Sequence, residues 1–285
     1  DAEQHLLGVV SFRELFAAPP DKTVRDVMRT DVVTVPDDMD QEAVSDVIAQ
    51  HDLMAVPVLD AEGRIKGIVT IDDIVDVVRE EATEDIQKIG GTAALDAPYL
   101  QVSILEMVRK RVGWLAILFI GSLLTATVIS YFEDQIARAV VLALFIPLII
   151  SSGGNSGSQA TTLVIRALAI GEVRPRDWLL VLGREIQAGL ALGAILGGIG
   201  FVRVTLFPPA EPGTPTELIA AVVAVSLVGI VLWGSLVGAM LPFALRRLGF
   251  DPASASAPFV ATLVDVTGLV IYFSVATLFL RGTLL

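Results

Sequence analysis

An ionisable side chain stands inside the apolar stretch FVATLVDVTGLVIYF, residues 259–273. Asp265 is the only charged residue from position 252 to position 280. A charged carboxylate at the centre of a membrane helix costs roughly 2.5–3.5 kcal/mol, so it stays protonated, pairs with a base, or faces water and a cation. A salt bridge requires Asp265 to lie near the helix ends that carry Arg166, Arg246 and Arg247. Otherwise the pattern predicts a cation path, in which a two-fold related copy supplies the second charge for a dication.

Polar side chains also interrupt the apolar stretch VLALFIPLIISSGGNSGSQATTLVIRALAIG, residues 141–171. Pro147 and the polar segment SSGGNSGSQATT, residues 151–162, predict a helix that is broken at membrane depth. Irregular backbone is tolerated there only where protein or a water-filled cavity satisfies it, and broken helices commonly build ion sites. Asn155 and Gln159 lie one turn apart on one face, and we expect them to line a pathway.

The small residues of the polar segment have a second interpretation. Gly153, Gly157 and Ser158 would let two helices approach closely. A packing face accounts for the glycines but leaves the two amide side chains unexplained, so we favour a functional segment.

The composition indicates a membrane protein with an acidic amino-terminal part. The chain is 54% hydrophobic with a mean hydropathy of +0.71. Residues 1–108 hold 23 acidic and 8 basic residues, whereas residues 109–285 hold 9 acidic and 12 basic residues. Such an acidic part repels nucleic acid and attracts metal ions. The chain has no cysteine, which excludes thiol nucleophiles and cysteine metal sites.

Five apolar stretches approach or exceed the ~20 residues that span a bilayer. The third is short, and we expect it to continue through Arg203, whose side chain can snorkel, to Phe207. The sequence therefore predicts an all-α polytopic membrane domain of five helices within residues 112–285. The five stretches are 112–132, 139–165, 186–202, 218–245 and 252–280.

Basic residues give the orientation of these spans. Nine of them flank the ends on the amino-terminal side of the membrane, and three flank the other ends. By the positive-inside rule, the amino-terminal part is cytosolic, and the carboxyl terminus and the loop FPPAEPGTPTE, residues 207–217, are outside. We expect this arrangement in the plasma membrane.

An internal repeat organises the amino-terminal part. GVVSFRE at 8–14 matches GIVTIDD at 67–73, each after an apolar strand and before a helix, so we expect the chain to begin within the first copy. The second copy reads as a β-α-β-β-α unit with a turn at Glu62-Gly63. Its segment AVPVLDAEGRIKGIVTIDDI resembles a CBS domain. We expect the end of a first CBS repeat at 1–18, a second repeat with an acidic helix at 19–88, and a hinge with a connecting helix at 89–111.

The CBS resemblance implies a regulatory nucleotide site. In the signature G-h-h-[ST]-x-x-D, Thr70 would meet a phosphate of ATP and Asp73 its ribose. Ser11 and Glu14 are the corresponding pair in the first copy. The other interpretation is that Thr70 caps the helix that follows it. The sequence has no Walker-type loop for hydrolysis.

The helix after the second repeat carries a run of like charges. Asp72, Asp76, Glu80 and Glu84 follow one another at i,i+4 spacing. Such pairs destabilise a helix by roughly 0.2–0.5 kcal/mol each unless something neutralises them. Divalent cations would neutralise them, which predicts a cation-sensing surface. The alternative is a solvated helix that leads to a linker.

Three segments carry a resemblance to one family. PLIISSGGNSGSQATTLVIRALAIGEV and APFVATLVDVTGLVIYFSVA resemble signature segments of the MgtE family of magnesium channels, and IDDIVDVVREEATEDIQKIGG is similar to the end of its regulatory region. The resemblance implies a homodimer in the lipid bilayer, with Asp265 holding a hydrated Mg²⁺ and the helix after the CBS domains acting as a plug. The family's amino-terminal acidic domain is expected to be missing. The implied pore lining is Gly154, Asn155, Gln159, Thr262 and Asp265.

Two other function classes were weighed against a channel. A proton- or sodium-coupled divalent-cation transporter would also need an intramembrane acid, but alternating access usually leaves internal repeats, and none is seen in residues 112–285. An intramembrane hydrolase needs a nucleophile with a base or an acid pair, and Asp265 is the only acid that we place inside the membrane. We therefore expect a Mg²⁺-selective channel gated by cytosolic Mg²⁺, and no enzyme.

Overall fold

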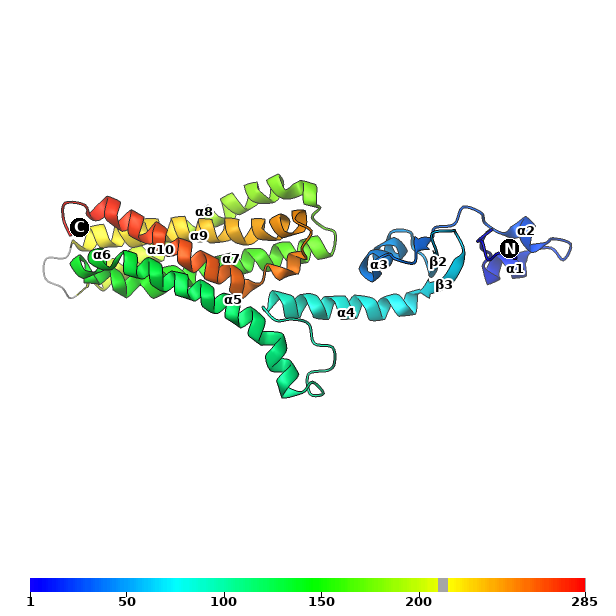
Figure 1. Cartoon of the computed structure of the whole chain (residues 1–285). Helices are drawn as coiled ribbons and strands as arrows, with labels where there is room; N and C mark the ends of the chain where they lie inside the picture. The colour runs from blue at the N-terminus through cyan, green and yellow to red at the C-terminus, as the bar shows by residue number, and fades with distance from the viewer. Residues whose placement is uncertain (210–214, 285) are drawn as a thin grey trace. The chain divides into compact units, whose positions relative to one another are not determined.

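The structure is a computed structural model that describes residues 1–209 and 215–284. The chain forms two compact units, Asp1–Thr83 and Glu84–Leu285, called here the amino-terminal unit and the helical unit (Figure 1). Part of the loop that the sequence predicts to be outside, residues 210–214, lies beyond the described residues.

The amino-terminal unit is built on a three-stranded sheet. β2 is the middle strand, parallel to β1 and antiparallel to β3. This arrangement confirms the small sheet with flanking helices that the sequence predicts. The elements are α1 (Phe12–Ala17), α2 (Val24–Val27), β1 (Val35–Pro36), α3 (Gln41–Gln50), β2 (Ala55–Leu59), β3 (Ile65–Thr70) and the first part of α4 (Ile71–Ile89).

A small apolar core holds the sheet against its helices. Val56 of β2 and Val35 of β1 pack against Val44 and Ile48 of α3. The turn between β2 and β3 is the predicted one: Gly63 has φ of +80°, and the Asp60 carboxylate accepts hydrogen bonds from the backbone N–H groups of Glu62 and Arg64. The buried core residues are Val35, Val44, Ile48, Val56 and Ile74.

The first copy of the repeat forms its helix but not its strand. Ser11 precedes α1 as Thr70 precedes α4. Val9, however, makes a single isolated antiparallel bridge to Arg29. A strand requires a neighbour along its whole length, and this contact is one residue long.

Within the described residues of the helical unit, five helices or helical segments are long and apolar enough to cross a membrane. The number agrees with the five predicted spans. Two short described elements lie between the spans, α6 (Glu133–Arg138) and the 3-10 helix η3 (Pro252–Ser254). The spans are α5 (Ile104–Tyr131), the 3-10 helix η1 with α7 (Val140–Phe145 and Ile146–Ala169), the 3-10 helix η2 with α8 (Pro175–Asp177 and Trp178–Leu206), α9 (Thr216–Arg247) and α10 (Ala257–Leu280).

Two of these helices begin earlier than the apolar stretches suggest. α5 starts at Ile104 and carries the basic residues 109–111 inside it, while α8 starts at Trp178 rather than near 186. α8 ends at Leu206, directly before Phe207, as predicted. The Arg203 guanidinium lies 4.8 Å from the centroid of the Phe207 ring.

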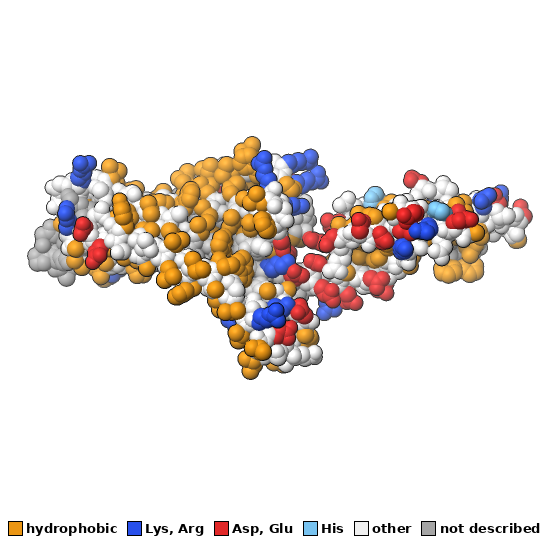
Figure 2. Space-filling model, viewed as in Figure 1, with side chains coloured by type: hydrophobic (Ala, Val, Ile, Leu, Met, Phe, Trp, Pro, Cys, Tyr) orange, Lys and Arg blue, Asp and Glu red, His pale blue; other side chains and the backbone are white. Residues whose placement is uncertain are grey.

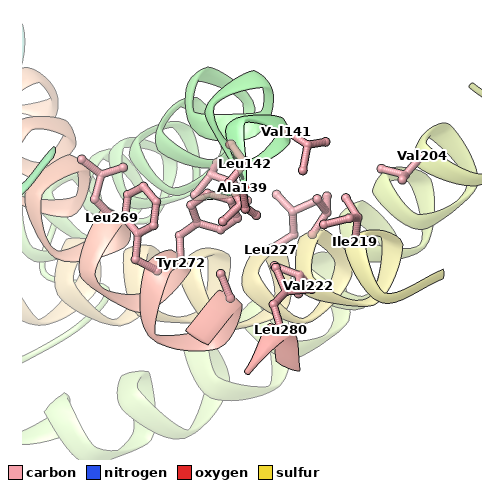
Figure 3. Packing of buried hydrophobic residues seen from close by; sticks show 14 of the residues in the cluster. Ala139, Val141, Leu142, Val204, Ile219, Val222, Leu227, Leu269, Tyr272 and Leu280 are labelled. Carbon is pink, nitrogen blue, oxygen red and sulfur yellow. Dashed lines mark hydrogen bonds between the residues drawn. The ribbon is translucent and has the colours of Figure 1, made fainter. Parts of the chain in front are cut away.

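α9 is the central helix of the bundle and packs against α7, α8 and α10. At one end of the bundle Tyr272 and Leu142 lie in the buried cluster shown in Figure 3, where the Tyr272 hydroxyl donates a hydrogen bond to the carbonyl oxygen of Leu142 (3.0 Å). Hydrophobic side chains are spread over the outside of the helical unit (Figure 2), as expected for a surface that faces lipid.

Candidate cation pathway

Asp265 lies on α10 with its carboxylate against α7. Ser256 caps α10 by accepting a hydrogen bond from the backbone N–H of Phe259 (3.4 Å), and Pro258 stands in the first turn. Asp265 follows about two turns later. A Cβ built on Gly154 of α7 would lie 3.4 Å from Oδ1 of Asp265. The absence of a side chain at Gly154 therefore keeps the space beside the carboxylate open.

The Asp265 carboxylate has no partner among the described residues of one chain. It makes no hydrogen bond and no ion pair there, and its side chain is half buried. The salt bridge to an arginine that the sequence leaves open is not formed. A charged group in a membrane helix needs a partner or water, so whatever satisfies Asp265 lies outside the described part of a single chain.

The polar segment is a continuous α-helix, which corrects the predicted break. α7 runs through residues 151–162 without interruption. The irregular backbone lies before it, in the 3-10 helix η1, and Pro147 stands in the first turn of α7. Proline is accommodated at this position because the first N–H groups of a helix have no intrahelical partner.

The glycines of α7 form a close contact with α9. A Cβ on Gly234 would overlap the carbonyl oxygen of Gly153, and a Cβ on Gly238 would overlap that of Gly157. Two hydroxyl contacts reinforce this packing: Ser156 and Ser235 share a hydrogen bond (2.7 Å), and Thr161 donates to the Gly238 carbonyl oxygen (2.8 Å). The packing interpretation is therefore right for Gly153 and Gly157.

Another side of α7 presents polar groups that α9 does not cover. Asn155 and Gln159 are exposed in the single chain, as are Ser151 and Thr162. The Asn155 amide donates only to the Ser151 hydroxyl (3.3 Å). We call these four residues the polar stripe of α7. Asn155 of the stripe follows Gly154 directly in the chain, and Gly154 is the residue of α7 that the structure places against Asp265.

Thr262, another predicted pore residue, contacts α5 and the backbone of its own helix. Its methyl group packs against Gly121 of α5, and its hydroxyl donates to the carbonyl oxygen of Pro258 in its own helix (2.9 Å). Thr262 therefore contributes to the contact between α5 and α10, and its hydroxyl is already satisfied.

The helix bounds place further acids inside the candidate spans, and Glu185 is the one that lies farthest from the ends of its span. Glu185 lies in α8, about two turns from the start of the helix. It was placed outside because the uncharged stretch begins at 186. The structure begins α8 at Trp178, so the helix extends beyond the uncharged stretch and contains Glu185.

The four acids of α4 do not share one environment. Asp72 accepts a hydrogen bond from Thr70, which lowers the pKa of that carboxyl below its ordinary value, and Glu84 pairs with Lys88. Asp76 and Glu80 are exposed and have no partner among the described residues. Within residues 1–209 and 215–284 of one chain, no three Asp, Glu or His side chains are gathered as a metal site.

Thr70 and Ser11 use their hydroxyls at helix starts. The Thr70 hydroxyl donates to Oδ2 of Asp73 (2.8 Å), and the Asp73 carboxylate also accepts from the Thr70 backbone N–H (3.2 Å). Ser11 and Glu14 form the same pair of bonds as a capping box. Ser11 thus caps α1, because its hydroxyl also accepts from the backbone N–H of Glu14 (3.2 Å). At Thr70 the bond from its backbone N–H to Asp73 is one half of such a box, and its hydroxyl acts as a donor.

The last turn of α4 is anchored within the helical unit. The Lys88 ammonium contacts Oδ2 of Asp251 (2.6 Å), and Ile89 packs in a cluster with Ile165 and Ala253. Burial lowers the pKa of Lys88, but its bonds to Asp251 and Glu84 outweigh that effect and raise it. The chain then turns at Gly91, which has φ of +75° and lies beside Pro258 at the start of α10.

Comparison with known proteins places these residues in a family. The family model MgtE, described as a divalent cation transporter, matches residues 146–275, and the CBS domain model matches residues 24–80. The chain is 45% identical over 282 residues to a protein of Thermus thermophilus named magnesium transporter MgtE. The chain is similar to the MgtE family over nearly its whole length. A second MgtE protein, from Enterococcus faecalis, is 34% identical over 281 residues.

The alignments cover nearly all of this chain but only part of its relatives. The two alignments take in 99% of this chain and 61% and 60% of the relatives, so the chain spans about three fifths of their length. A solved structure titled as the cytosolic domain of the Mg²⁺ channel MgtE in complex with ATP has 45% identity and a TM-score of 0.27, and covers 27% of this chain and 31% of the other. The two relatives that match along nearly the whole chain are named as transporters and not as enzymes, in agreement with the sequence prediction.

Proposed function

We propose that two copies of this chain form a Mg²⁺-selective channel, with α7 and α10 of each copy lining one pore on the two-fold axis. The observation that carries the proposal is the unpartnered Asp265 carboxylate against Gly154. Beside it runs the polar stripe of α7, exposed in the single chain. Polar groups at membrane depth do not face lipid, so a second copy and a water-filled path are the surroundings that suit them.

The chemistry of these groups suits a hydrated dication. Mg²⁺ gives up water reluctantly and is commonly held through its water ligands by few carboxylates. One Asp265 per chain gives two negative charges at a two-fold axis. The amides of Asn155 and Gln159 are available to contact water ligands because they are exposed in the single chain. The transporter names of the relatives support the choice of Mg²⁺ as the transported ion.

Charge removal at Asp265 tests the pore. Purified Asp265→Asn protein is expected to fold and dimerise as the wild type does, and to lose most Mg²⁺ flux into liposomes. Asp265→Glu is expected to lie between the two, since one methylene displaces the carboxylate. Wild-type flux in dimeric Asp265→Asn protein would reject the proposal. Flux that requires a proton or sodium gradient would instead favour the coupled transporter.

The proposed orientation places the amino-terminal unit in the cytosol and the carboxyl terminus outside, on the basis of the flanking basic residues. Because the chain has no cysteine, Thr283→Cys introduces a single thiol near the end of α10. We expect a membrane-impermeant maleimide to label it in intact cells. Labelling that appears only after lysis would show that the carboxyl terminus lies in the cytosol.

We also propose that Mg²⁺ binding to the acidic face of α4 closes the pore. Asp76 and Glu80 are the acids of the run that remain unpartnered among the described residues, so they are the ones free to bind a dication between copies. The double variant Asp76→Asn, Glu80→Gln is expected to shift closure to higher Mg²⁺. Asp46→Asn on α3 removes an exposed charge elsewhere and serves as the control. An unshifted dose response in the double variant would sink this idea.

The nucleotide proposal rests on the hydroxyl and acid spacing at Thr70 and Asp73. ATP is expected to bind weakly there and to change the Mg²⁺ concentration needed for closure. Because the Thr70 hydroxyl also donates a hydrogen bond to Asp73 at the start of α4, calorimetry on Thr70→Val needs a thermal unfolding curve beside it. Equal ATP affinity in a folded Thr70→Val protein would reject the site.

A further inference from the structure

A cavity lies beside the start of α5, entirely within the helical unit. Its volume is about 900 Å³, and its walls come from the last turn of α4, the connecting segment before α5, and the first three turns of α5. The pore residues of α7 and α10 do not line it. The charged and aromatic lining residues are Lys88, Asp96, Glu106, Arg109, Lys110 and Trp114.

The cavity lies at the level where α5 enters the apolar layer. After Arg111 the chain carries no charge until Glu133. Arg109 and Trp114 lie about 7.5 Å apart along the helix axis, which is close to the thickness of one headgroup layer. The Trp114 ring stacks on Phe259 of α10 at 6.2 Å between centroids and is thereby held in place. Tryptophan at such a level is typical of the membrane interface.

The charges of the lining leave one cation free. Lys88 is paired with Glu84 and Asp251, and Lys110 contacts both carboxylate oxygens of Asp96 (2.9 and 2.8 Å). Arg109 makes no hydrogen bond or ion pair within the described chain. A guanidinium is well suited to a phosphate group because it can donate two parallel hydrogen bonds. Glu106, one turn earlier on the same helix, disfavours a ligand with more than one negative charge.

We propose that this cavity binds the headgroup of an anionic phospholipid with a single negative charge, with Arg109 holding the phosphate and Trp114 at the level of the glycerol. The turns of α5 beyond Trp114 favour a lipid over a free anion. Leu115 and Phe119 are 54% and 65% exposed, and acyl chains that continue past Trp114 would cover them whereas inorganic phosphate would not. The proposed ligand is a lipid of the bilayer and not the transported ion, so this proposal does not depend on Asp265 lining a pore.

Lipid titration of the purified chain in detergent, read by native mass spectrometry, tests the site. Arg109→Gln is expected to raise the dissociation constant for phosphatidylglycerol about fivefold, the effect of one basic residue near an anionic surface. Arg111→Gln is the matched control, because Arg111 carries the same charge two residues on and does not line the cavity. Arg109→Lys is expected to retain part of the affinity.

A second variant keeps the test independent of charge. Gly113 lines the cavity and a Cβ there meets no atom within 4 Å, so Gly113→Leu places a side chain in the site and is expected to weaken phosphatidylglycerol binding as Arg109→Gln does. Equal weakening by Arg109→Gln and Arg111→Gln would mean a diffuse surface attraction and overturn the proposal. Displacement of the lipid by millimolar inorganic phosphate would overturn it in favour of a soluble anion site.

Discussion

Gly154 on α7 and Asp265 on α10 are neighbours across a helix contact: a Cβ on Gly154 would lie 3.4 Å from the Asp265 carboxylate and 3.2 Å from Cβ of Ala261. The two residues are far apart in the sequence, yet one supplies the charge and the other the space around it. Any side chain at Gly154 must therefore displace Ala261, the carboxylate, or α10 itself.

Gly154→Ala is expected to lower Mg²⁺ flux, though by less than Asp265→Asn, because a methyl group crowds the carboxylate without removing its charge. The measurement is flux into liposomes at matched protein density. Gly198→Ala on α8 is the control, since a Cβ there meets no atom within 4 Å. If both alanine variants conduct like the wild type, the space beside Asp265 is not part of the pathway.

Gly238→Ala is expected to destabilise the helical unit by about 1–3 kcal/mol, the usual cost of overpacking. The new methyl group would overlap the backbone carbonyl of Gly157, which cannot rotate away as a side chain can. Thermal unfolding in detergent would show a lower midpoint than for Gly198→Ala. An unchanged midpoint would mean that α7 and α9 separate without cost.

Tyr272→Phe is expected to cost about 1–3 kcal/mol of stability, because it leaves the buried carbonyl of Leu142 without its donor. That carbonyl belongs to η1, where the 3-10 backbone needs an outside partner. Tyr131→Phe deletes the same hydroxyl from a side chain that is 82% exposed, and should be neutral in the same unfolding assay. Equal midpoints for the two variants would show that the Leu142 carbonyl finds another donor.

Glu14 is expected to titrate far below an ordinary glutamate. Hydrogen bonds from the Ser11 backbone and hydroxyl, and then the bond from Arg29, lower its pKa from 4.5 to about 2. Because the folded pKa is depressed, its contribution to the stability of α1 is complete above pH 4.5 and is lost as the pH falls through 2. NMR titration of the side-chain carboxyl measures this, with Glu14→Gln as the variant that lacks the transition. Titration near 4.5 would show that the capping box is open in solution.

The sequence alone was sufficient for the features that depend on local pattern. Apolar length is a property of each segment, so five spans could be predicted, and the repeat GVVSFRE and GIVTIDD pointed to helices that begin after Ser11 and Thr70. The isolated charge of Asp265 could likewise be singled out, since a lone acid in an apolar helix is costly wherever that helix packs.

Only the tertiary structure decided which side of α7 packs against α9 and which side carries the exposed polar stripe. Glycine, serine and proline in SSGGNSGSQATT and its flank suggest a broken helix by propensity, but packing on α9 overrides propensity and keeps α7 continuous. That contact joins Gly157 to Gly238, and Lys88 meets Asp251 across 163 residues. Such pairings depend on how whole helices fit together, because ridges, small residues and hydrogen bonds from distant segments must match at once. No local window of the sequence contains both partners.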